Sequence, residues 1–216
     1  SLETLNMPKF VEMSDEEVKE SIHNCDDQRL FAVYAAIKRG IDLSYIYDVT
    51  KIDLWFLNKL KNLVNMEKEM NESFLSDELY LEAKKMGFTN KTIEQISNQK
   101  ITKPIYASYK MVDTCGGEFE ALTPYYYSTY DDEDEVIYDG NDKILVVGSG
   151  PIRIGQGIEF DYSCVHGAWA INRLGYESIM INNNPETVST DYDTADRLYF
   201  EPLCPEDVMN VIKAEN

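Results

Sequence analysis

The sequence is poor in the residues on which zinc and redox sites depend. Its 216 residues include two histidines and four cysteines, and no two cysteines form a CxxC pair. Sparse cysteines without metal-ligand spacing argue against a structural zinc site. They are typical of reduced thiols, and therefore of a cytoplasmic protein.

Basic residues and long apolar runs are also scarce. Twenty Lys and Arg face 39 Asp and Glu, which gives a formal net charge of −19. Such a surface repels phosphate backbones and anionic lipid, so we expect neither nucleic-acid nor membrane partners. No stretch reaches the ~18 apolar residues of a membrane span, and residues 1–30 lack a signal-peptide pattern.

Hydrophobic residues make up 44% of the chain, enough for one large or two small globular domains. Residues 1–103 predict an all-helical domain. Ser14 and Glu17 form a capping box, and Asp26 is the expected cap of a helix ending near Gly40. The apolar face of that helix is expected to hold four residues: Leu30, Val33, Tyr34 and Ile37.

Further helix signals follow in the same domain. Thr50 and Asp53 open a longer helix, with an expected buried stripe of Ile52, Trp55, Phe56, Leu60 and Leu63. Residues 65–76 are expected to be a polar connection. Ser76 caps the next helix, which ends at Gly87, and Thr89–Ile96 is the expected last one.

Residues 104–142 predict an extended junction between two domains. The stretch PIYASYKMVDTC alternates and is rich in aromatic and β-branched residues. The tyrosines of YYYSTY (125–130) are expected to pack at the domain junction. The run DDEDE (131–135) is expected to be a solvated linker.

Residues 143–216 alternate between strand and helix signals, which predicts an α/β domain with parallel strands in a Rossmann-like sheet. The expected strands are KILVVG, SIMIN and RLYFE, with helices at 159–174 and from Pro205. The sequence ends where another strand is expected, so the sheet is predicted to be truncated. Because the sequence also begins without Met, we expect a piece of a longer chain.

The glycine-rich loop ILVVGSGPIRIGQG matches neither common phosphate-binding motif. GxGxxG requires glycine at 153, where the sequence has Arg153, and the Walker A lysine is replaced by Gln156. Glycines allow a close approach to the backbone. We expect Arg153, Glu159 and Glu186 to gather at the carboxyl ends of the strands, where open α/β sheets place their sites. A dinucleotide-binding oxidoreductase and a pure interaction module are the alternatives.

Long strings of the sequence resemble the large chain of carbamoyl-phosphate synthase. GQGIEFDYSC and NNNPETVSTDYDT carry the likeness, and YKMVDTCGGEFEALTPYYYSTY and IDLWFLNKL extend it over nearly the whole chain. The resemblance implies an oligomerisation domain followed by the start of the second synthetic half. That start is a Rossmann-like domain preceding an ATP-grasp domain, and the ATP-grasp domain itself is not included.

The resemblance also implies function. The family is an ATP-dependent ligase that forms carbamoyl phosphate from bicarbonate, ammonia from glutamine and two ATP, with Mg²⁺ or Mn²⁺. Carbamate passes between two active sites through an internal tunnel. Gly157, with Arg153 beside it, is expected to line that tunnel, and Glu159 and Glu186 match carboxylates near its outlet. A glutaminase small chain is the implied partner. We expect no cofactor or ATP site in these residues, and the sequence does not separate the arginine from the pyrimidine isozyme.

Overall fold

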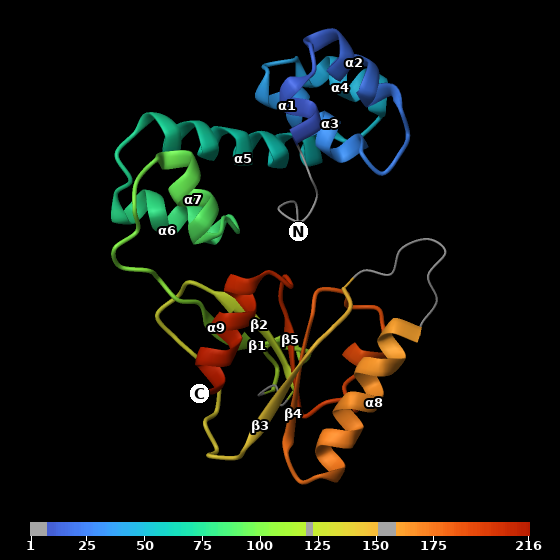
Figure 1. Ribbon diagram of the computed structural model, residues 1–216, viewed down its shortest axis with the longest axis vertical. Coiled ribbons are helices and arrows are strands. Elements are labelled where there is room, and N and C mark those ends of the chain that lie inside the picture. The colour runs from blue at the N-terminus through green and yellow to red at the C-terminus, as the bar shows by residue number, and fades with distance from the viewer. Residues whose placement is uncertain (1–7, 120–122, 151–158) are drawn as a thin grey trace. The chain divides into compact units, whose positions relative to one another are not determined.

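The computed structural model describes residues 8–119, 123–150 and 159–216 (Figure 1). The chain divides into two compact units, one extending to Thr102 and the other running from Lys103 to Asn216. The first is helical and the second combines helices with a sheet. The expected order, a helical domain followed by an α/β domain, is confirmed. No helix in the described ranges is long and apolar enough to cross a membrane.

The helical unit packs short helices around the long helix α5. Its elements are α1 (Pro8–Glu12), α2 (Asp15–His23), α3 (Arg29–Lys38), α4 (Leu43–Thr50), α5 (Leu54–Glu72), α6 (Asp77–Lys85) and α7 (Asn90–Ser97). One core joins α1–α4 to the first half of α5, and α6 and α7 lie toward the other end of α5 (Figure 1).

Side-chain caps set the starts of several helices. The Ser14 hydroxyl accepts a hydrogen bond from the Glu17 amide at 3.3 Å, and the Glu17 carboxylate accepts one from the Ser14 amide at 2.7 Å. This capping box is the one that the sequence predicts. Ser76 caps α6, also as predicted, and Thr89, expected to be the first residue of the last helix, is the cap of α7.

The predictions for α3 were wrong in two respects. Asp26 accepts a hydrogen bond from the Gln28 amide, so it caps the turn before the helix, and α3 begins at Arg29. Leu30 is 47% exposed, whereas every residue from Phe31 to Ile37 is buried. Because α3 is surrounded by its neighbours, its burial does not follow a one-sided stripe.

The predictions for α5 were wrong at both ends. Trp55 and Phe56 are 59% and 58% exposed, whereas Leu57 is fully buried. They lie one or two residues from Leu57, about 100° to 200° around the helix axis, so they face away from the core. Residues 65–72, expected in a polar connection, continue the helix because Met66 and Met70 are buried.

Two helices have no counterpart in the sequence predictions. One is α1, and the other is α4, whose cap is Asp42. In α4 Ile46 is fully buried, while Tyr45 and Tyr47 are each 38% exposed. Exposed aromatic residues on a helix of eight residues obscure its apolar periodicity.

The α/β unit contains a five-stranded sheet in the order β1-β2-β5-β4-β3. Its elements are β1 (Ser108–Met111), β2 (Tyr125–Thr129), β3 (Lys143–Val147), α8 (Glu159–Arg173), β4 (Glu177–Asn182), the 3-10 turn η2 (Val188–Thr190), β5 (Arg197–Phe200) and α9 (Pro205–Glu215). β3, β4 and β5 are parallel, as predicted, β2 is parallel to β5, and β1 is antiparallel to β2.

The two helices cover opposite faces of this sheet (Figure 1). Ile179 and Ile181 of β4 pack with Val211 of α9 on one face, and Met180 packs with Ala168 of α8 on the other. Alternate residues of a strand point to opposite faces, so β4 is buried on both sides. β3, in contrast, lies at the sheet edge, and Ile144 and Val147 are 39% and 50% exposed although KILVV is continuously apolar after its lysine.

The segment 104–142 supplies β1 and β2 to the same sheet. The prediction that YYYSTY packs at a domain junction was wrong, because Tyr126 stacks on Tyr199 of β5 within the α/β unit. The acidic run 131–135 is exposed, as expected, but its last residue also lies beside β1. The Glu135 amide donates to the Tyr109 carbonyl at 2.8 Å.

Candidate functional site

The carboxyl ends of β3, β4 and β5 bring three loops together. The first loop begins at Gly148, whose amide donates to the Ile181 carbonyl at 2.8 Å. A Cβ atom at Gly148 would lie 2.7 Å from Asn182 Cγ, which is too close for any side chain. Glycine is therefore required here by the approach of the β4 end, without reference to a ligand.

Gly150 is the second glycine whose role is structural. Its φ of +72° lies in the left-handed region that L side chains rarely adopt. A Cβ atom there would also lie 3.3 Å from Asn183 Oδ1 and 3.4 Å from Leu203 Cδ1. The loops after β3, β4 and β5 thus meet at this position.

A network of buried polar side chains connects the end of β4 with η2 and the start of α8. Asn182 is fully buried, and its amide nitrogen donates to the Ser189 hydroxyl at 3.3 Å. The Ser189 backbone amide donates to Asp161 Oδ2 at 2.8 Å. Asp161, in the first turn of α8, is 1% exposed, and the network joins α8 to the turn η2. The sequence predictions missed all three residues.

The predicted site residues divide into two groups. Arg153 and Gly157 lie outside the described residues. Glu159 is the first residue of α8 and is exposed. Glu186, also exposed, lies in the loop between β4 and η2, where its amide donates to Asn184 Oδ1 at 3.1 Å. Because α8 packs against η2, the two acids lie on segments that contact each other.

Glu201 is a buried carboxylate directly after β5 that the sequence predictions also missed. The Ser128 hydroxyl of β2 donates to Glu201 Oε2 at 2.9 Å, and the Ser128 amide donates to Oε1. Burial raises the pKa of Glu201 to about 7, against the effect of both Ser128 hydrogen bonds. The strand RLYFE gave no signal of this, because an acid after a strand is ordinarily exposed.

Two thiols of the α/β unit, those of Cys164 and Cys204, are not activated. Burial, assisted by the Asp161 charge, raises the pKa of Cys164. Burial and the hydrogen bond from its thiol to Asp207 raise the pKa of Cys204 to about 11. Since the thiolate is the nucleophile, neither cysteine is suited to covalent catalysis at neutral pH.

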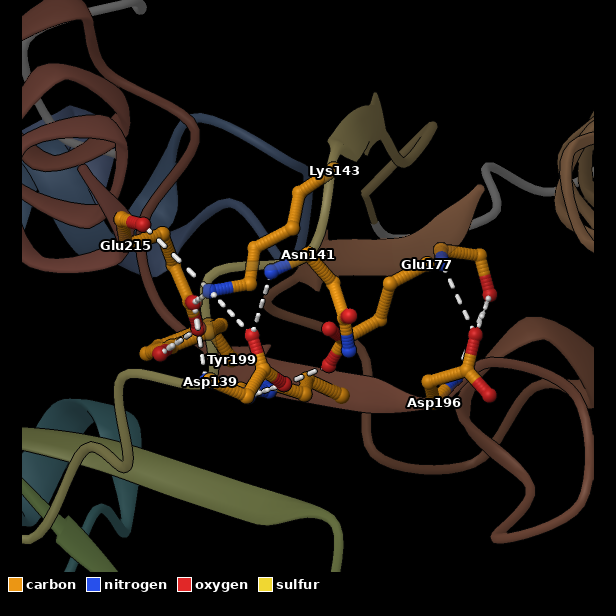
Figure 2. A network of polar contacts seen from close by, with 9 residues as sticks. Asp139, Asn141, Lys143, Glu177, Asp196, Tyr199 and Glu215 are labelled. Atoms are coloured by element: carbon orange, nitrogen blue, oxygen red, sulfur yellow. Dashed lines mark hydrogen bonds and ion pairs between the residues drawn. The ribbon is translucent and has the colours of Figure 1, made fainter. Parts of the chain in front are cut away.

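A second charged cluster lies at the opposite ends of the same strands (Figure 2). Arg197, the first residue of β5, contacts Glu177 at 2.6 Å, Glu215 at 2.9 Å and Asp139 at 2.8 Å. Lys143 contacts Asp139 and Glu215 at 3.3 Å and 3.2 Å. Every charge has an opposite partner, and the cluster joins the starts of β3, β4 and β5 to the end of α9. The role of this cluster is therefore structural.

The remaining titratable side chains of the unit are scattered. Within the described ranges, no three His, Cys, Asp or Glu residues form a group that could hold a metal ion. His166 lies on the exposed face of α8, where its ring contacts Tyr162 and Trp169.

Comparison with known proteins identifies the family. Residues 1–108 match the model of the carbamoyl-phosphate synthetase large chain, oligomerisation domain, and residues 140–216 match the carbamoyl phosphate synthase preATP-grasp domain. The chain belongs to the carbamoyl phosphate synthase large chain family. This confirms the resemblance read from its sequence motifs.

Individual relatives carry the same name. A carbamoyl phosphate synthase large chain from Caldanaerobacter subterraneus subsp. tengcongensis is 54% identical over 94% of this chain and 20% of its own length. Those from Lachnoclostridium phytofermentans and Clostridium acetobutylicum are 50% and 51% identical over 98% of this chain and 21% of theirs. The chain thus spans about a fifth of the length of these carbamoyl phosphate synthase relatives. They do not support the oxidoreductase alternative.

Proposed function

We propose that this chain is a part of a glutamine-dependent carbamoyl phosphate synthase that supplies self-association and a section of the carbamate tunnel. The observation that carries the proposal is identity of 50% or more to carbamoyl phosphate synthase large chains along nearly the whole sequence. The complete enzyme would work with a glutaminase small chain and would bind ATP with Mg²⁺ or Mn²⁺ in domains other than these. The chain alone would not hydrolyse ATP.

The helical unit is the proposed self-association module, in keeping with the oligomerisation domain that its sequence matches. The α/β unit is the proposed Rossmann-like domain that precedes an ATP-grasp domain. Its parallel strands β3, β4 and β5, with α8 and α9 on opposite faces, are consistent with that class.

The tunnel proposal concerns the loop after β3 and the acids beside it. The loop lacks the lysine of a phosphate-binding loop, so it is free for another task. Carbamate decomposes in water, and its transfer between two sites requires a passage that excludes solvent. Gly157 and Arg153 would line this passage, and Glu159 and Glu186 would stand at its outlet.

Gly157→Leu in the full-length enzyme tests the tunnel role. A leucine adds a bulky side chain where the proposal needs open space, so overall synthesis of carbamoyl phosphate is expected to fall at least about tenfold. Bicarbonate-dependent ATP hydrolysis and ATP formation from carbamoyl phosphate and ADP are expected to stay within about twofold. Gly167→Leu is the control, because Gly167 lies within α8 with open space around its Cβ position and an ordinary backbone conformation. Normal synthesis by Gly157→Leu would refute the tunnel role.

A further inference from the structure

Asp161 makes an unusual contact for an acid in the first turn of a helix. Such an acid ordinarily accepts hydrogen bonds at the start of its own helix. Asp161 Oδ2 instead accepts from the backbone amide of Ser189, 28 residues away, at 2.8 Å. A charge-assisted hydrogen bond in a buried setting fixes the positions of both partners firmly. It therefore ties the start of α8 to η2.

Ser189 is held from the other side by Asn182. The Asn182 amide nitrogen donates to the Ser189 hydroxyl, and Asn182 Oδ1 accepts from the Asn184 amide at 3.3 Å. Asn182 itself has little freedom, because the backbone of Gly148 packs directly against its side chain. The end of β4, the turn η2 and the first turn of α8 therefore form one connected, buried unit.

The two exposed acids of the proposed outlet extend from this unit. Glu159 precedes Asp161 by two residues in the first turn of α8. Glu186 precedes Ser189 by three residues, and its own amide is bonded to Asn184 Oδ1. A series of hydrogen bonds thus connects the backbone that carries one acid to the backbone that carries the other.

We propose that Asp161 and Asn182 are positioning residues, which act through Ser189 to hold Glu159 and Glu186 in one fixed arrangement at the carbamate outlet. The inference rests on the proposed function. Because both residues are buried, they influence the passage of carbamate indirectly, by fixing the positions of Glu159 and Glu186. Loss of the Asp161 bond frees the start of α8 from η2 and lets the acids separate, while both active sites stay intact.

The first test compares Asp161→Ala with Asp161→Asn in the full-length enzyme. Alanine removes the acceptor for the Ser189 amide, whereas asparagine keeps an acceptor oxygen of the same shape. Overall synthesis is expected to fall at least about tenfold in Asp161→Ala and less than about threefold in Asp161→Asn. Both partial reactions are expected to stay within about twofold in each variant. The exposed Asp193→Ala serves as the control, with no change expected. Equal loss in the two Asp161 variants, or a parallel loss of the partial reactions, would overturn the proposal.

A double-mutant cycle separates positioning from a general packing role. In an enzyme that already carries Glu159→Ala and Glu186→Ala, adding Asp161→Ala is expected to lower synthesis by no more than about twofold. A packing role predicts the same tenfold loss in both backgrounds, and that result would contradict the proposal.

If Asp161→Ala does not fold, Ser189→Ala tests the positioning role instead. It keeps the Asp161 bond but removes the Asn182 link, and a loss of synthesis of about threefold is expected only when Glu159 and Glu186 are present.

The two proposals can fail separately. Normal synthesis by the Glu159→Ala, Glu186→Ala enzyme would remove the outlet function, and the positioning role with it. Loss of synthesis in that enzyme, together with normal synthesis by Asp161→Ala, would overturn the positioning role alone.

Discussion

Glu201 shows how a single buried carboxyl group makes the stability of a sheet depend on pH. It is 3% exposed, and burial raises its pKa from an ordinary value near 4.5 to about 7. The folded protein therefore holds this proton to higher pH than the unfolded chain does. The stability that the group contributes is complete below about pH 4.5 and is lost as the pH rises to about 7, which amounts to roughly 3 kcal/mol.

Glu201→Gln is expected to remove this loss. Glutamine is neutral at all these pH values, its oxygen can accept from the Ser128 amide, and its nitrogen can donate to the Ser128 hydroxyl. In urea unfolding the variant should match the wild type near pH 4.5 and exceed it near pH 8 by up to about 3 kcal/mol. Asp132→Asn, at an exposed position, is the control. A variant less stable than the wild type at pH 8 would contradict the assignment.

The starts of β3, β4 and β5 depend on one another through Arg197. Its guanidinium group is shared among Glu177, Glu215 and Asp139, and the Tyr199 hydroxyl donates to Glu215 (Figure 2). The pKa of Glu177 is raised by burial and by the neighbouring Asp139, so these carboxyl groups need a cation beside them. The charged cluster therefore holds the register of three strands.

Arg197→Met is expected to destabilise the α/β unit by about 3–5 kcal/mol, because it leaves buried carboxylates without their main partner. Lys68→Ala provides the matched comparison. Lys68 pairs with Glu72 on the exposed side of α5 at 4.0 Å, and its loss should cost less than about 0.5 kcal/mol. Denaturant unfolding monitors both variants. Similar values for the two would show that the charged cluster does not hold the sheet.

Self-association of the whole chain is opposed by its charge. Each copy carries a formal net charge of −19, so two copies repel each other at low ionic strength. The helical unit nevertheless matches an oligomerisation domain, and exposed apolar side chains such as Trp55 and Phe56 are present on it. Apolar contact and charge repulsion therefore act in opposite directions.

Sedimentation velocity is expected to show association that increases with salt. Raising the ionic strength from about 0.05 M to about 0.5 M shortens the Debye length from roughly 14 Å to roughly 4 Å and weakens the repulsion. The population of dimers or larger species should therefore grow over this range. A monomer at both salt concentrations, at high protein concentration, would argue against self-association through this unit.

Local signals in the sequence were sufficient wherever neighbouring residues decide the structure. The capping box at Ser14, the cap at Ser76, and the parallel β3, β4 and β5 with their helices were all predicted, because caps and strand periodicity depend on residues a few positions apart. The family was also readable from long motif strings. The placement of Gly157 and Arg153 in a tunnel stays a prediction.

Only the tertiary structure decided which faces are buried and which polar groups meet. Trp55 and Phe56 are residue types that are common in a core, yet they point outward. Burial of Leu57 fixes which side of α5 faces α3 and α4. Most of YYYSTY forms the strand β2 beside β5, through pairing of residues 73 positions apart in the sequence. Asp161 meets Ser189, and Ser128 meets Glu201, over separations of 28 and 73 residues. Such contacts form only when the chain folds back on itself, and no local pattern records them.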